Sequence, residues 1–330
     1  MTLFLRFTAI YVLFGMGFVV VFRASPLALI LDMAADVSAV TLMFFDQGVW
    51  PLAVFCALFF FLPRGELLRR IPLALAGLMG CSLFFLTFTM VKTSLPSAVP
   101  FWADGVLGHV DRAMHFGVDP WVITHAMLPD WPGNSFQVYY IGLWIMPALF
   151  FPVLLALFDG DEARVRKYVI LYIWAWVGVG TLFAMALMSG GPIYHQHLTG
   201  SDMFAPLYET LATSGITDSV VGATQSMLWA AYASGGQNLG SGISAFPSVH
   251  VAVASVIGLY VIDRWRIALI PMVVMIAGYQ ILSVHLGWHY AIDGYFSILT
   301  VLALRAVLTR HAVKHDFASD PAQWPDLAEN

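Results

Sequence analysis

Hydrophobic runs recur from one end of the chain to the other. Those long enough, or nearly long enough, to cross about 30 Å of hydrocarbon as a helix cover residues 3–22, 48–63, 71–91, 136–158, 168–188, 248–262, 267–284 and 289–308. A further apolar stretch, residues 26–45, carries Asp32 and Asp36 and fits an interfacial or re-entrant helix. The pattern predicts a polytopic all-α protein with about six to nine membrane segments.

Polar connections alternate with these runs, and their charge predicts an orientation. Lysine and arginine concentrate in every second connection, at Arg64, Arg69, Arg70, Arg164, Arg166, Lys167, Arg264 and Arg266, and again at Arg310 and Lys314. Connections of this kind face the cytoplasm, so both termini are expected there. The two long connections, residues 92–135 and 189–247, then lie on the outer side.

Composition supports this interpretation. Of 330 residues, 60% are hydrophobic and 11% are charged, whereas a soluble domain carries about a quarter charged residues. The net charge of -5 is scattered, and no basic face suggests a nucleic-acid partner. We expect membrane segments over residues 1–70, a catalytic membrane domain over 71–310 and a flexible cytoplasmic tail over 311–330.

The first long connection contains an amphipathic stretch. Val106, Val110 and Met114 recur at helical spacing, while Asp104 and Asp111 take other faces. This spacing predicts an interfacial helix that lies on the membrane surface.

The sequence FPSVH precedes one hydrophobic run and carries the first candidate for chemistry. Ser248 is placed to cap the helix that follows, so His250 falls in its first turn. The N–H groups and the dipole of a helix N-terminus favour an anion there, and a phosphate is the natural guest.

The second candidate is HLGWHYAID, in which His285, His289 and Asp293 are spaced four residues apart. If helix extends through this stretch, the three side chains share one face. Asp293 would then accept from one nitrogen of His289 and leave the other free as a nucleophile. Both stretches begin helices that run inward from the outer face, so His250 and His289 are expected at equal depth. One can attack phosphorus while the other protonates the leaving oxygen.

FPSVH followed by HYAID resembles the two signature motifs of the type 2 phosphatidic acid phosphatase superfamily. The second motif is most similar to that of the inositol phosphorylceramide synthase branch. The resemblance implies a six-helix core and a phosphohistidine mechanism with His289 as nucleophile, Asp293 as its orienting partner and His250 as general acid and base. It implies transfer of a phosphoryl or phospho-headgroup group, such as inositol phosphate, between lipids in a bacterial inner membrane, without metal or cofactor.

The chain departs from the phosphatase branch, which carries a Lys and Arg motif upstream and an Arg in the last motif. Here SGGPIYH stands upstream, and Val284 follows Ser283. Arginine normally supplies bidentate phosphate binding, so other groups must replace it. The candidates are Ser248, His285, Tyr194, Ser241 and Gly242.

Three alternatives stay open at this point. A lipid phosphatase would use the same mechanism with water as acceptor. A zinc or iron enzyme could use His285, His289, Asp293 and His250 as ligands. A transporter would also carry ionisable groups and glycine breaks inside the membrane, although here the polar groups cluster at one face.

Overall fold

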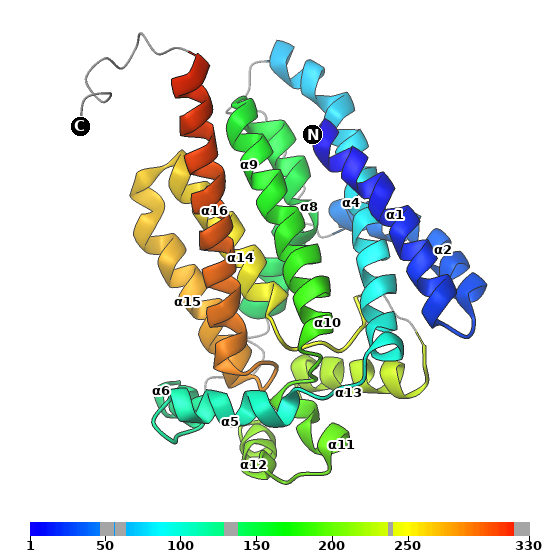
Figure 1. Ribbon diagram of the computed structural model, residues 1–330, viewed down its shortest axis with the longest axis vertical. Coiled ribbons are helices and arrows are strands. Elements are labelled where there is room, and N and C mark those ends of the chain that lie inside the picture. The colour runs from blue at the N-terminus through cyan, green and yellow to red at the C-terminus, as the bar shows by residue number, and fades with distance from the viewer. Residues whose placement is uncertain (47–55, 57–63, 129–137, 237–239, 320–330) are drawn as a thin grey trace.

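The computed structural model describes residues 1–46, 56, 64–128, 138–236 and 240–319, and every regular element in these ranges is a helix (Figure 1). Within this part of the chain, seven helical stretches are long and apolar enough to cross a membrane. The prediction of an all-α, polytopic helical bundle is therefore confirmed.

The seven stretches are formed by single helices or by consecutive helical elements. Their bounds are α1 (Thr2–Phe22), α2 (Pro26–Asp46), α4 (Arg64–Ala98), η1 with α8 (Val138–Gly142 and Leu143–Phe158), α9 with η2 and α10 (Glu162–Ile173, Trp174–Phe183 and Ala184–Ala186), η4 with α15 (Arg266–Ala268 and Leu269–His285) and α16 (Ala291–Ser319).

A shorter helix lies among them. α14 (Val249–Arg264) has 16 residues and packs against α15, α16, η2 and α8. Most of its side chains are buried. The FPSVH sequence therefore stands at the N-terminus of a helix that is surrounded by other helices, where a polar group contacts protein and not lipid.

The observed segments differ from the expected ones near both ends of the chain. Residues 26–45, expected as an interfacial or re-entrant helix, form part of a continuous helix of spanning length, α2. Residues 311–319 of the expected tail continue α16. The expected segment at 48–63, apart from residue 56, and the rest of the tail, 320–330, lie outside the described residues.

The N-terminal helices pack on α4 through small residues. A Cβ added at Gly15 of α1 would lie 2.5 Å from Thr87, and one added at Gly80 of α4 would lie 2.6 Å from Leu5. Glycine at these positions lets the two helix backbones approach closely, as is common between membrane helices. The side chains that α1 contributes to the core, such as Phe4, reach the aromatic cluster of α4 and η2.

The basic residues gather at one end of the bundle and hold several helices together there. Asp263 of α14 pairs with Lys167 of α9 at 2.7 Å and with Arg305 of α16 at 2.5 Å. Arg164 pairs with Asp159 at 2.6 Å, in the turn between α8 and α9. These ion pairs join α9, α14 and α16 near the end of the bundle where α1 begins and α16 ends (Figure 1).

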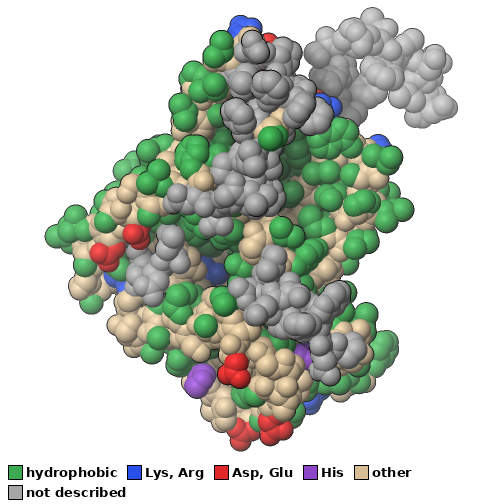
Figure 2. All heavy atoms as spheres, turned by 180° about the vertical axis from the view of Figure 1, so that it is seen from behind, with side chains coloured by type: hydrophobic (Ala, Val, Ile, Leu, Met, Phe, Trp, Pro, Cys, Tyr) green, Lys and Arg blue, Asp and Glu red, His purple; other side chains and the backbone are tan. Residues whose placement is uncertain are grey.

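The opposite end carries the short helices. They are α5 (Asp104–Met114), α6 (Pro120–Met127), η3 (Pro192–Tyr194), α11 (His195–Thr199), α12 (Ala205–Thr213) and α13 (Val220–Ala233). They lie across the lower end of the bundle in Figure 1. Figure 2 shows hydrophobic side chains covering much of the bundle, while acidic and histidine side chains appear toward this lower end.

α5 is the helix predicted from the apolar spacing, and its polar face points inward. Asp104 and Asp111 are buried, whereas Val106, Val110 and Met114 are exposed. An ordinary surface helix buries its apolar stripe. The reversed arrangement fits a helix whose outer face meets lipid and whose carboxylates bind the protein beneath it.

Candidate active site

Ser248 joins the starts of two helices. Its hydroxyl accepts from the N–H of Val251 at 3.4 Å, which caps α14, and its own N–H donates to the carbonyl of Asp293 at 3.3 Å. The capping prediction for Ser248 is confirmed, and His250 falls in the first turn of α14 as expected. Because the second bond fixes α14 to the start of α16, the two signature stretches come together.

His289 and Asp293 form the predicted contact, from a different local structure. α15 ends at His285, and His289 lies in the short connection before α16. Gly287, with φ +75°, turns the chain there, and the N–H of His289 donates to the carbonyl of Ser283. A side chain needs φ below zero almost everywhere, so glycine is the residue that permits this turn.

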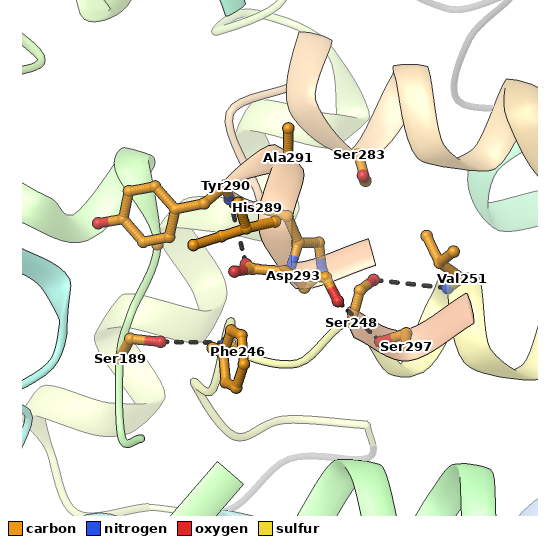
Figure 3. Close-up of polar contacts among 12 residues, drawn as sticks. Ser189, Phe246, Ser248, Val251, Ser283, His289, Tyr290, Ala291, Asp293 and Ser297 are labelled. Atoms are coloured by element: carbon orange, nitrogen blue, oxygen red, sulfur yellow. Dashed lines mark hydrogen bonds and ion pairs between the residues drawn. The ribbon is translucent and has the colours of Figure 1, made fainter. Parts of the chain in front are cut away.

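Asp293 lies beside the ring of His289 (Figure 3). Its Nδ1 lies 3.0 Å from Oδ2 of Asp293, and the same oxygen accepts from the N–H of Tyr290 at 3.1 Å. When this carboxylate is ionised it only accepts hydrogen bonds, and Nδ1 would then carry the hydrogen while Nε2 keeps its lone pair. This is the orientation that a nitrogen nucleophile requires.

One cavity of about 290 Å³ has His250, His289 and Lys92 in its wall. The ring of His250 stacks on Trp144 with centroids 3.9 Å apart and on Tyr140 with centroids 4.7 Å apart. The rest of the wall is largely aromatic and aliphatic. Lys92, His250 and His289 are thus the three basic side chains of a largely apolar cavity. A few polar groups in an apolar pocket are the usual form of a small-molecule site.

Lys92 is the residue of this cavity that sequence reasoning missed. It lies near the C-terminal end of α4, with Nζ 5.8 Å from the centroid of the Phe88 ring. A Cβ added at Gly242 would lie 2.9 Å from Cγ of Lys92, so that glycine packs against the lysine stem. The available signal was a lone lysine at the end of a long apolar run, because ionisable groups inside membrane helices usually serve function.

The predicted phosphate-binding residues do not all reach this cavity. Tyr194 lines it, although its hydroxyl donates to the carbonyl of Gln225 at 2.9 Å. Ser241 and Gly242 line a larger neighbouring cavity of about 530 Å³. Ser248 is buried as the cap of α14, and His285 stacks on His125 with ring centroids 3.9 Å apart, beyond the wall that holds His289.

Two buried carboxylates of α5 hold the loops around the cavity. Asp104 accepts from the N–H groups of Gly190 and Gly191, each at 2.9 Å, and from the Tyr290 hydroxyl at 3.0 Å. Burial raises the pKa of Asp104, and these hydrogen bonds offset part of that rise. The carboxylate therefore links the SGGPIY loop to the residue that follows His289.

Asp111 plays the equivalent part at the start of α16. It accepts from the N–H of Ala291 at 2.9 Å and from that of Ile292 at 3.1 Å. Burial raises the pKa of Asp111 as well, and the two backbone donors lower it in part. Because the free N–H groups at a helix start need acceptors, Asp111 fixes the helix that carries Asp293.

His289 is neutral near pH 7. Burial, together with the charge of Lys92, lowers the pKa of this histidine to about 3. A neutral imidazole with one nitrogen bonded to a carboxylate can attack an electrophile through the other. The arrangement is therefore competent for nucleophilic displacement at phosphorus.

Comparison with known proteins gives one match. A sequence profile described as the PAP2 superfamily matches residues 106–307. These residues include His250, His289 and Asp293, together with α5 from residue 106 onward, whereas α1, α2, Lys92 and Asp104 precede them. No curated protein and no solved structure matched the chain.

Proposed function

Because the chain belongs to the PAP2 superfamily, whose members are phosphatases or phosphotransferases, we propose that it moves a phosphoryl-bearing headgroup from a phospholipid donor to a lipid acceptor. The observation that carries this proposal is the shared cavity of Lys92, His250 and His289. Asp293 lies behind the ring of His289 and leaves the cavity side of that ring for the substrate.

The first half of the reaction transfers phosphorus to the protein. Nε2 of His289 attacks, the N–P bond forms, and the P–O bond to the departing lipid alcohol breaks. Protonated His250 gives its proton to that oxygen, which takes the bonding electron pair. Asp293 stabilises the positive charge that develops on the ring of His289.

The second half returns the phosphoryl group to a lipid. The acceptor hydroxyl gives its proton to His250, the new O–P bond forms, and the N–P bond breaks. His289 is neutral again and His250 is protonated again, so the cycle closes without an added acid or base. An imidazole can serve as acid and as base in turn, and the negative charge of a phosphate beside His250 favours the protonated form of that histidine.

Lys92 takes the part that the absent arginines play in the phosphatase branch. Lys92 lines the same cavity as the two histidines, from the C-terminal part of α4. The non-bridging phosphate oxygens would lie beside its ammonium group. A fixed positive charge in an apolar wall stabilises negative charge more strongly than it would in water. Ser248, His285, Ser241 and Gly242 then support the site from outside its wall.

The lining of the cavity favours transfer over hydrolysis. Aromatic side chains line it, among them those of Phe85, Phe88, Tyr140, Trp144 and Trp176, besides that of Trp288. An apolar wall excludes water and gives a lipid alcohol an advantage as acceptor. A phosphatase would need a hydrated approach to the phosphohistidine.

The bundle is proposed to stand with this site on the outer side of a bacterial inner membrane. The basic cluster, near the start of α1 and the end of α16, marks the opposite end, and such clusters face the cytoplasm. The exposed apolar stripe of α5 would then contact the outer leaflet beside the cavity.

The test is a comparison of purified wild type with His289→Ala on phospholipids labelled in the phosphate, with and without ceramide or diacylglycerol. We expect a new phospholipid only when the acceptor is present, and neither turnover nor labelled protein from the variant. Release of phosphate regardless of acceptor would assign the site to a lipid phosphatase. Full turnover by the variant would remove His289 from the mechanism.

A further inference from the structure

The catalytic cavity has a larger neighbour. The second cavity, of about 530 Å³, lies between the turn that joins α1 to α2, the C-terminal end of α4 and the C-terminal end of α13. It meets the catalytic cavity at Ile243, which lines both, and Thr93 of its wall follows Lys92 in α4. The second cavity is therefore a neighbour of the proposed phosphate position beside Lys92.

We propose that the second cavity binds the hydroxylated part of the headgroup that travels with the phosphoryl group. This inference rests on the proposed function, because it takes the phosphate to be at His289. In headgroup transfer the leaving group is the lipid alcohol, and the polar group on phosphorus stays in the site through both half-reactions. A polar space adjoining the phosphate position is where that group must be held.

The lining of the second cavity fits a neutral polyol. Its polar side chains are hydroxyls, one carboxylate and one guanidinium, from Ser25, Thr93, Ser97, Tyr232, Ser234, Ser241, Asp32 and Arg23. Alcohols donate to a carboxylate and exchange hydrogen bonds with other hydroxyls. Because Arg23 offsets the charge of Asp32, the space carries no net charge that would select an ammonium or a second phosphate.

Arg23 also explains why this wall is in place. Its guanidinium donates to the carbonyl of Thr93 at 2.9 Å and to that of Gly235. These bonds tie the α1–α2 turn to the ends of α4 and α13, so the turn forms one side of the cavity. That side lies outside residues 106–307, which are the part shared with the superfamily. The N-terminal helices thus supply a wall that the catalytic region does not itself contain.

The experiment compares two donors that differ in the group under question. Phosphatidylglycerol carries a hydroxylated headgroup, whereas phosphatidic acid has nothing beyond its phosphate. Asp32→Asn removes the carboxylate's charge, and Ala28→Phe fills the cavity from α2. We expect each to lower the ratio of kcat/KM for phosphatidylglycerol to that for phosphatidic acid at least tenfold. An equal loss on both donors, or no loss on either, would overturn the inference.

Matched controls lie on the same helix. Asp36→Asn and Ala35→Phe change residues of α2 that do not line the cavity, and both are expected to keep the wild-type ratio. A third donor, phosphatidylethanolamine, tests the chemistry, because its ammonium headgroup should respond less than twofold to Asp32→Asn. A larger loss with this donor than with phosphatidylglycerol would mean that the cavity selects a cation.

Two further measurements separate the possible failures. The second cavity could instead bind a free polyol, so glycerol is supplied as an acceptor. If Asp32→Asn changes transfer to glycerol but leaves the phosphatidylglycerol to phosphatidic acid ratio intact, the headgroup assignment is wrong. Binding of dioctanoyl phosphatidylglycerol, followed by tryptophan fluorescence in detergent, needs no turnover. Weakened binding in Asp32→Asn alongside full turnover in His289→Ala would sink the proposed mechanism but keep the cavity assignment.

Discussion

The carboxylate of Asp293 bonds to the ring of His289 across a helix boundary, with Nδ1 and Oδ2 3.0 Å apart. Asp293 belongs to the first turn of α16, while His289 precedes the helix. The same carboxylate oxygen accepts from the N–H of Tyr290. The pair therefore fixes the tautomer of the ring and the position of the connection together.

Replacement of this carboxylate separates orientation from binding. Asp293→Asn should retain donor binding and lose turnover roughly 10³–10⁴-fold, because the amide no longer selects the Nδ1–H tautomer or stabilises a charged ring. Rates and donor Kd of purified protein in nanodiscs measure the two effects. Asp161→Asn, at the opposite end of the bundle, is the control. A parallel loss of donor binding would show that Asp293 acts through the fold.

Lys92 is expected to act through its charge. Lys92→Met should lower kcat/KM roughly 10²-fold by removing a fixed cation beside the phosphate, while Lys92→Arg should recover part of that loss. Inhibition by orthovanadate provides a second readout, because the anion should bind Lys92→Met more weakly. Equal vanadate inhibition of wild type and Lys92→Met would place the lysine outside the phosphate site.

The pH dependence of His289 modification tests its protonation state. With its pKa lowered to about 3 by burial and by Lys92, His289 stays neutral down to pH 5, whereas an ordinary histidine becomes charged below about 6.5. Neutral His289 favours the folded state, so its contribution to stability is present above pH 6.5 and is lost as pH falls toward 3.

Diethyl pyrocarbonate modifies neutral imidazole, so its rate reports this difference. Mass spectrometry should find that labelling of His289 changes less than twofold between pH 7 and 5, while labelling of a histidine-containing reference peptide falls more than fivefold. A parallel fall at His289 and in the peptide would mean that His289 titrates as a free imidazole does.

The loop that is hydrogen-bonded to Asp104 contains Gly191, where a side chain would not fit. Gly191 has φ +89°, and a Cβ added there would lie 2.3 Å from the carbonyl oxygen of Trp288, which precedes His289. Gly191→Ala should therefore lower both thermal stability and turnover. Gly200→Ala is the matched control, because φ is +73° but no atom lies within 4 Å.

Only the backbone strain applies to that control, at about 1 kcal/mol. Unfolding in detergent, followed by a thiol or fluorescence probe, compares the two variants. If Gly191→Ala is no more destabilising than Gly200→Ala, then the connection that bears His289 shifts freely, and turnover should be preserved.

Removal of the α16 acceptor tests the role of α5. Asp111→Ala leaves the N–H groups of Ala291 and Ile292 without their acceptor and should cost about 1–3 kcal/mol of stability. Asp111→Asn keeps one acceptor oxygen and should restore part of both stability and turnover. An unchanged melting temperature in Asp111→Ala would show that the helix start finds other partners.

Local patterns predicted those parts of the site that depend on near neighbours. The apolar runs gave the helical bundle, and the proline and serine before His250 gave the cap of α14. The four-residue spacing of His289 and Asp293 predicted their contact, even though Gly287 ends the helix before them. Such features depend on the chain within one or two turns, and the sequence contains them.

The remaining features depend on contacts between distant segments. Lys92 lines the cavity of His250 and His289, and Gly242, far along the chain, packs against its stem. The inward carboxylates of α5 bind backbone N–H groups of loops more than eighty residues away. Periodicity showed that α5 is amphipathic, but it could not show that the polar face would be the buried one.

α5 also determines the spacing of the site. Asp104 and Asp111 are seven residues apart, which is about two turns, or about 10.5 Å along a helix. One carboxylate holds the loop at Gly190 and Gly191, and the other holds the start of α16. The helix therefore sets the distance between this loop and the start of α16. A single residue inserted between the aspartates would rotate one of them by about 100° and release its loop, with no change in any residue that lines the cavity.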